Sequence, residues 1–200
     1  MNLPNKLTLG RIILVPFFVA VLLIPFPFHN IIALLLFIAA SVTDMLDGKI
    51  ARKNNFITDF GKFADPLADK ILVLSALLCF IQLGWCDCTA VIIVLFREFT
   101  VTSIRLIAAA KGEVIAANIW GKVKTVTQMI AVISILVFRS AYEAALMLLP
   151  AIIAQSADFT ATANFWLFWS GEALIWISTV FAIISGVIYL AQNKHFISEK

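Results

Sequence analysis

The chain of 200 residues is 62% hydrophobic, contains 17 phenylalanines and carries a formal net charge of only +3. Its mean hydropathy of +1.01 is higher than the core of a soluble domain can account for, so the composition excludes an ordinary soluble protein. We therefore expect an all-α integral membrane protein that lies in the lipid bilayer and has no nucleic-acid partner.

Apolar runs indicate the membrane spans in chain order. No charged residue occurs between Ile12 and Thr43, and the run is interrupted by the turn-like sequence PFPFHN at 25–30. Because this run is too long for one span, we interpret it as two helices. Further spans are expected at 67–84, 89–110, 121–139 and 171–191. The pattern predicts about six transmembrane helices in a single domain covering residues 1–200.

The segment 140–170 is the least regular part of the chain. It is apolar and is broken by Pro150, so the sequence leaves open an external amphipathic helix or a re-entrant piece.

The cationic residues indicate the orientation of the chain. If the N-terminus is cytoplasmic, every Lys and Arg lies on or near the cytoplasmic side except Arg97, within a span, and Arg139, outside. The segment between spans two and three then faces the cytoplasm, and the turn WCDC at 85–88 faces outward. We interpret the cysteines of that turn as ordinary loop residues, because they lack the spacing of a zinc site.

Four aspartates stand at the cytoplasmic ends of spans two and three. Asp44 and Asp47 are three residues apart and Asp65 and Asp69 are four apart, so on helices each pair shares a face. Like charges about 4 Å apart repel by roughly 1 kcal/mol in water and roughly 4 kcal/mol at a dielectric near 20. A divalent cation would relieve this repulsion, and carboxylate oxygens suit Mg²⁺, Mn²⁺ or Ca²⁺.

Small and basic residues lie between the aspartates. Gly48 and Ala51 leave room for the close approach of a ligand, and Arg52 can bind phosphate through two N–H groups. Gly61 precedes the second pair of aspartates by one helical turn. These features favour a site for a nucleotide diphosphate bridged by metal, whereas a single Asp at a helix end is usually a cap or a solvated charge.

The spacing D-x-x-D-G-x-x-A-R-x8-G-x-x-x-D-x-x-x-D resembles the signature of the CDP-alcohol phosphatidyltransferases, a family of membrane enzymes with six helices. The resemblance implies the fold of that family and a pair of divalent ions, Mg²⁺ or Mn²⁺, that hold the diphosphate of the CDP substrate. It implies that Asp69 is both a ligand and the general base. The implied metal ligands are Asp44, Asp47, Asp65 and Asp69. The nucleotide and its phosphates would be bound by Gly48, Arg52 and Gly61, with Asn5 and Thr8 as further candidates. Helix capping is an equally good account of Asn5.

A second group of polar residues indicates the acceptor. Arg97 and Glu98 lie within span four, where an ionisable residue costs about 2.5 to 3.5 kcal/mol unless it is paired or faces a cavity. Arg105 follows on the same face as Arg97, and Lys122 and Lys124 come after a short loop. Such a patch favours an anionic acceptor. A cytoplasmic basic flank would explain the two lysines but not the intramembrane Arg97.

The phrases NLPNKLTLGRI, DPLADK, REFTVTSIR and AANIWGKVKT are similar to the bacterial branch of that family whose acceptor is glycerol 3-phosphate. This resemblance implies an enzyme of the bacterial cell membrane that transfers the phosphatidyl group of CDP-diacylglycerol to glycerol 3-phosphate, with CMP and phosphatidylglycerol phosphate as products. Arg97, Arg105, Lys122 and Lys124 would hold the acceptor's phosphate, and Asp69 would take the proton of its primary hydroxyl.

Three questions stay open at this point. The same family includes enzymes for serine, inositol or inositol phosphate, so another acceptor is an alternative. A cation transporter could also use an aspartate cluster, although transport favours carboxylates near the middle of the bilayer. The sequence does not decide whether two copies form a homodimer.

Overall fold

The computed structural model describes residues 3–54, 59–113, 115, 118–150 and 158–194, and the side chains of 9–43, 70–113, 115, 118–150 and 158–194. All regular structure in these residues is helical. The helices are α1 (Leu3–Leu23), α2 (His29–Asn54), α3 (Asp59–Gln82), α4 (Cys88–Ala110), α5 (Ile119–Leu148) and α7 (Phe159–Gln192).

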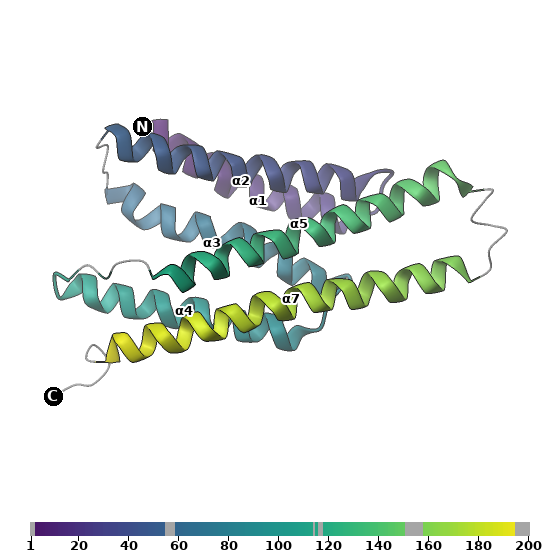
Figure 1. Cartoon of the computed structure of the whole chain (residues 1–200). Coiled ribbons are helices and arrows are strands. Elements are labelled where there is room, and N and C mark those ends of the chain that lie inside the picture. Colours follow the sequence, from purple (N-terminus) through teal and green to yellow (C-terminus); the bar gives the residue numbers. More distant parts are fainter. Residues whose placement is uncertain (1–2, 55–58, 114, 116–117, 151–157, 195–200) are drawn as a thin grey trace.

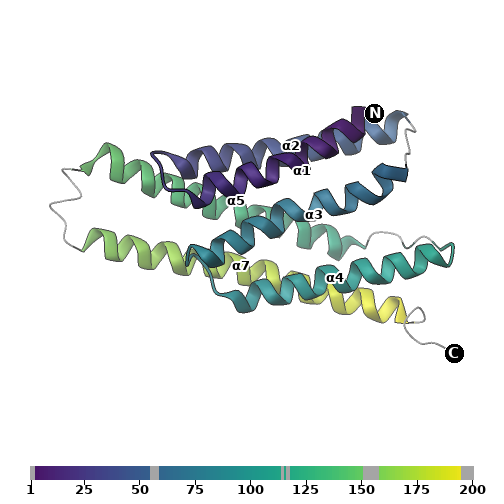
Figure 2. The same cartoon turned by 180° about the vertical axis from the view of Figure 1, so that it is seen from behind.

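The helices form one elongated bundle (Figure 1). α1 packs against α2 and α3, α7 packs against α4 and α5, and α2 contacts α5. α1 and α3 begin, and α2, α4 and α7 end, at the same end of the bundle, as the view from behind also shows (Figure 2). We call this the N-terminal end of the bundle.

Turn and capping residues separate the apolar helices where the sequence indicates. α1 ends at Leu23 and α2 begins at His29, so the long uncharged run is two helices, as predicted. Asp87 caps α4 by accepting a hydrogen bond from Thr89 N at 3.3 Å. Gly84 and Gly112, at the ends of α3 and α4, have φ angles of +68° and +79°, which glycine adopts without strain.

The segment 140–170, which the sequence left open, is largely a continuation of two helices. α5 runs on to Leu148 and α7 begins at Phe159. With 30 and 34 residues, these helices are about 45 and 51 Å long at 1.5 Å per residue, more than the roughly 30 Å of a hydrocarbon core.

The outer surface of the bundle is apolar. Phe17, Phe96 and Trp166 are 64%, 73% and 66% exposed, whereas Phe18 and Phe37 pack together in the core with their ring centroids 5.7 Å apart. Large exposed apolar patches mark a surface that meets lipid or another protein. Among the described residues, α5 and α7 are each long and apolar enough to cross a membrane. The shorter apolar stretches are Leu9–Leu23, His29–Thr43 and Lys70–Gln82. Six complete spans therefore remain a prediction.

Candidate active site

The aspartate motif lies on α2, which ends at the N-terminal end of the bundle, and on α3, which begins there. α2 continues to Asn54 and so includes Asp44 and Asp47, while α3 begins at Asp59 and includes Asp65 and Asp69. Each pair is therefore on a helix, the condition under which its members share a face. Gly48, Ala51 and Arg52 belong to α2, and Gly61 to α3. The side chains of the whole motif lie outside the described residues.

Asn5 and Thr8 belong to the first turns of α1, and their side chains also lie outside the described residues. Because α1 begins at Leu3, Asn5 stands inside the helix and not at its N-cap.

A cavity of about 440 Å³ opens between α3, α4 and α5. It brings together all four cations that the sequence assigned to the acceptor. Its lining residues are Lys70, Val73, Leu74, Arg97, Glu98, Val101, Arg105, Asn118, Gly121, Lys122, Lys124, Thr125, Val126, Gln128 and Met129. Five of these side chains are cationic, and Glu98 is the one carboxylate among them, so the described lining carries a large positive excess.

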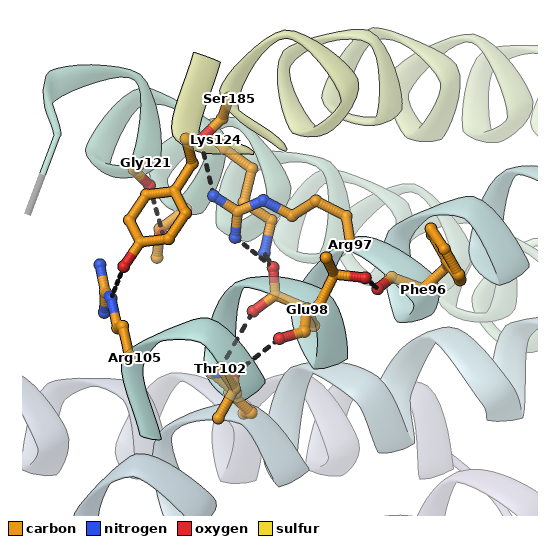
Figure 3. Close-up of polar contacts among 12 residues, drawn as sticks. Phe96, Arg97, Glu98, Thr102, Arg105, Gly121, Lys124 and Ser185 are labelled. Atoms are coloured by element: carbon orange, nitrogen blue, oxygen red, sulfur yellow. Dashed lines mark hydrogen bonds and ion pairs between the residues drawn. The ribbon is translucent and has the colours of Figure 1, made fainter. Parts of the chain in front are cut away.

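Glu98 is the centre of the charged part of the cavity (Figure 3). Its Oε1 accepts hydrogen bonds from Arg97 Nη1 at 2.7 Å and from Lys124 Nζ at 2.6 Å. Lys70 Nζ lies 3.8 Å from Glu98 Oε2. Glu98 and Lys124 are only 6% and 5% exposed. Buried charges persist in proteins when they are paired and hydrogen-bonded, and this cluster meets both conditions.

Arg97 is held from two sides. Its Nη2 donates to Ser185 Oγ of α7 at 2.6 Å, in addition to its bond with Glu98. Gly186 lies against the side chain, since a Cβ at that position would come within 3.0 Å of Arg97 Cγ. The close approach of α7 therefore depends on glycine at position 186. Together these contacts orient the guanidinium along the cavity wall.

Lys70 connects the cavity to the aspartate helix. It donates to Thr102 Oγ1, and Thr102 Oγ1 in turn donates to the backbone oxygen of Glu98 at 2.6 Å. Lys70 directly follows Asp69 in α3, and Val73, another lining residue, comes one helical turn after Asp69. The cavity therefore begins where the aspartate-bearing turn of α3 ends.

The two remaining cations lie nearer the surface. Arg105 and Lys122 are exposed, and Arg105 Nε donates to Tyr189 Oη at 3.4 Å. The Arg105 guanidinium carbon also lies 5.6 Å from the centroid of the Tyr189 ring, within cation–π range. Exposed cations together with a buried one in the same cavity suit the capture of an anion from water.

Glu98 is expected from the sequence to be functional, because an ionisable residue within a span is costly, but no particular role is assigned to it, to Lys70 or to Gln128. The structure places all three in the cavity wall. The position of Lys70 next to Asp69 and the four-residue spacing of Lys124 and Gln128 were the available signals. Among the described side chains, no group of three His, Cys, Asp or Glu could hold a metal ion.

Comparisons with known proteins agree with the geometry. The family profile of the CDP-alcohol phosphatidyltransferases matches residues 1–184. The chain is similar to proteins named CDP-diacylglycerol–glycerol-3-phosphate 3-phosphatidyltransferase. The relative from Bacillus subtilis is 39% identical over 96% of this chain and 95% of its own length. The one from Rickettsia bellii is 33% identical over 98% of this chain and 97% of its own. The chain therefore belongs to the CDP-alcohol phosphatidyltransferase family.

Proposed function

We propose that this protein transfers the phosphatidyl group of CDP-diacylglycerol to glycerol 3-phosphate, releasing CMP and forming phosphatidylglycerol phosphate. The observation that carries the acceptor assignment is the cationic cavity beside the aspartate-bearing turn of α3. The names of the relatives from Bacillus subtilis and Rickettsia bellii support the same donor and acceptor.

The charge of the cavity favours a phosphorylated acceptor. Arg97 and Lys124 share the carboxylate of Glu98, so the cluster retains positive charge after these pairs are counted. An anion bound there would balance the excess positive charge, whereas glycerol or inositol would leave that excess uncompensated. Serine and inositol therefore fit the described wall less well than a phosphate monoester.

Membership of this family implies dependence on a divalent metal. The donor set of this chain fits Mg²⁺ or Mn²⁺, because four carboxylates supply the hard oxygen ligands that these ions prefer. We assign Asp44, Asp47, Asp65 and Asp69 to two such ions. When bound, the ions would neutralise the diphosphate of CDP-diacylglycerol and the charge that develops on the leaving CMP.

The chain's own residues have separate tasks in the reaction. Gly48, Arg52 and Gly61, with Asn5 and Thr8, bind the nucleotide and its phosphates. Arg97, Arg105, Lys122 and Lys124 hold the acceptor phosphate and orient the molecule, which removes much of the entropic barrier to attack.

Asp69 takes the proton of the acceptor's primary hydroxyl. The resulting oxygen forms a bond to the phosphorus that carries diacylglycerol, and the bond from that phosphorus to the CMP oxygen breaks.

The membrane orientation is part of this proposal. α2 and α4 end, and α3 begins, at the N-terminal end of the bundle (Figure 1). The sequence places basic residues such as Lys53, Lys62 and Lys111 along these parts of the chain. The positive-inside bias then favours a multi-pass protein of the bacterial cell membrane with this end in the cytoplasm. The acyl chains of CDP-diacylglycerol stay in the bilayer, and the soluble acceptor enters from the cytosol.

The test is an acceptor screen with purified protein, labelled CDP-diacylglycerol and added Mg²⁺. We expect product with glycerol 3-phosphate and none above background with glycerol, serine or inositol. Turnover of inositol phosphate or serine in place of glycerol 3-phosphate would overturn the acceptor assignment.

A further inference from the structure

Gln128 is a buried polar residue of the cavity that the contacts around Glu98 do not use. It lies on α5, is 3% exposed and lines the cavity. Its Nε2 has no hydrogen-bond partner among the described residues. Native proteins pair nearly all of their buried polar atoms, so a donor of this kind in a ligand cavity indicates a bond made when the ligand is present.

The other neutral polar side chains of the described wall are already engaged. Asn118 accepts from Trp120 N at 3.4 Å as the cap of α5, and its Nδ2 donates to Gln192 Oε1 at 3.2 Å. Thr125 Oγ1 donates to the backbone oxygen of Gly121 at 3.0 Å. Among the neutral polar side chains in the described part of the lining, Gln128 is therefore the one with a buried amide nitrogen that has no hydrogen-bond partner.

Gln128 also stands apart from the cations along the cavity. It follows Lys124 by four residues, which is one helical turn or about 6 Å along the axis of α5. The lining residues Val73, Leu74 and Met129 are apolar. A ligand that contacts both the cations and Gln128 has an anionic end at the cations and a neutral hydrogen-bonding group about one helical turn away.

We propose that Gln128 is a specificity-determining residue that donates its amide N–H to the secondary hydroxyl of the acceptor. The inference rests on the proposed function and deepens it, because it describes the acceptor class as a phosphate monoester with a hydroxyl between its two ends. In glycerol 3-phosphate the phosphate meets the cations and the primary hydroxyl meets Asp69. The secondary hydroxyl is then the group left for Gln128.

The test compares glycerol 3-phosphate with 3-hydroxypropyl phosphate, which keeps the phosphate and the primary hydroxyl but lacks the secondary hydroxyl. We expect the wild type to prefer glycerol 3-phosphate in kcat/KM by at least about tenfold, since a buried donor is left unpaired by the analogue. Gln128→Met and Gln128→Leu keep a similar volume without the donor. In both variants the preference should fall to about threefold or less, mainly through a lower kcat/KM for glycerol 3-phosphate.

Thr127→Val is the matched control. The Thr127 hydroxyl donates within α5 to the backbone oxygens of Val123 and Lys124, both at 3.0 Å, and the residue does not line the cavity. This variant should keep the wild-type preference. KM for CDP-diacylglycerol and the elution profile of each variant monitor folding.

Three results would overturn the inference. A wild type with equal kcat/KM for both acceptors would remove its basis, as would equal losses for both acceptors in the Gln128 variants. A wild type that does not use glycerol 3-phosphate at all would overturn the proposed function together with this inference. The first two results leave the proposed function standing.

Discussion

Glu98 and Lys124 form a buried ion pair between α4 and α5, with 2.6 Å between Glu98 Oε1 and Lys124 Nζ. The two residues are 26 positions apart in the chain, and the same carboxylate oxygen also accepts from Arg97. The pair joins two of the helices that form the cavity, so it supports both the fold and the orientation of the cations.

Removing the carboxylate should destabilise the bundle. Glu98→Gln leaves the buried Lys124 ammonium without its counter-ion, and we expect the free energy of unfolding to fall by about 3 to 5 kcal/mol. Unfolding of the purified protein by SDS in mixed micelles would measure this change. Glu113→Gln, at an exposed carboxylate, should change stability by no more than about 0.5 kcal/mol. Additive losses in Glu98→Gln, Lys124→Gln and their double variant would show that the pair is not coupled.

Asp69→Asn should reduce turnover by about 10² to 10⁴, because the amide cannot accept the acceptor's proton. Initial rates of CMP release at saturating concentrations of both substrates give the change in kcat. Asp87→Asn provides the control, since Asp87 caps α4 at the α3–α4 connection and does not line the cavity. Near-normal turnover in Asp69→Asn would remove Asp69 from the role of base.

Chelation should abolish activity, and added Mg²⁺ or Mn²⁺ should restore it, because the diphosphate and the four carboxylates would otherwise repel each other. Activity measured across a titration of EDTA and then of each metal ion provides the test. Full activity in excess chelator would contradict the assignment of the aspartates to metal.

Arg105→Ala should weaken the use of glycerol 3-phosphate with little effect on CDP-diacylglycerol. A charge-assisted hydrogen bond contributes about 1.5 to 3 kcal/mol, so kcat/KM for the acceptor should fall by about tenfold to 150-fold. Tyr189→Phe removes the hydroxyl that accepts from Arg105 at 3.4 Å but keeps the ring, and its effect should be smaller. If Arg105→Ala instead raised KM for CDP-diacylglycerol alone, the residue would belong to the nucleotide site.

Cys86, in the α3–α4 connection, and Cys88, the first residue of α4, report the orientation of the protein in the membrane. Cys88 is exposed, whereas burial, with the nearby Glu172 and Asp87 carboxylates, raises the pKa of the Cys86 thiol to about 12. Cys86 therefore stays a protonated, unreactive thiol until the pH approaches that value. In Cys79→Ser cells, a membrane-impermeant maleimide at about pH 7 should label Cys88 from outside and leave Cys86 unmodified. Labelling of Cys88 only in inverted vesicles would reverse the proposed topology.

The helices and the aspartate motif could be predicted from the sequence alone. Apolar runs must be helical in a membrane because every backbone polar group needs an internal partner, and PFPFHN separates the first two runs. The aspartates are three and four residues apart, and helix geometry then puts the members of each pair on one face without any tertiary information. The positions of the basic residues likewise predict the orientation of the chain in the membrane from the sequence alone.

The contacts within the cavity depended on tertiary structure. Ser185 and Gly186 lie 88 and 89 positions after Arg97, and only the packing of α7 on α4 brings them to its side chain. The continuation of α5 and α7 through much of 140–170 was also open, because an apolar run with a central proline is compatible with several arrangements. Periodicity gives the face on which a residue lies. The partner of that face depends on how separate helices pack, and this packing placed Glu98 among the cations and Gln128 in the cavity wall.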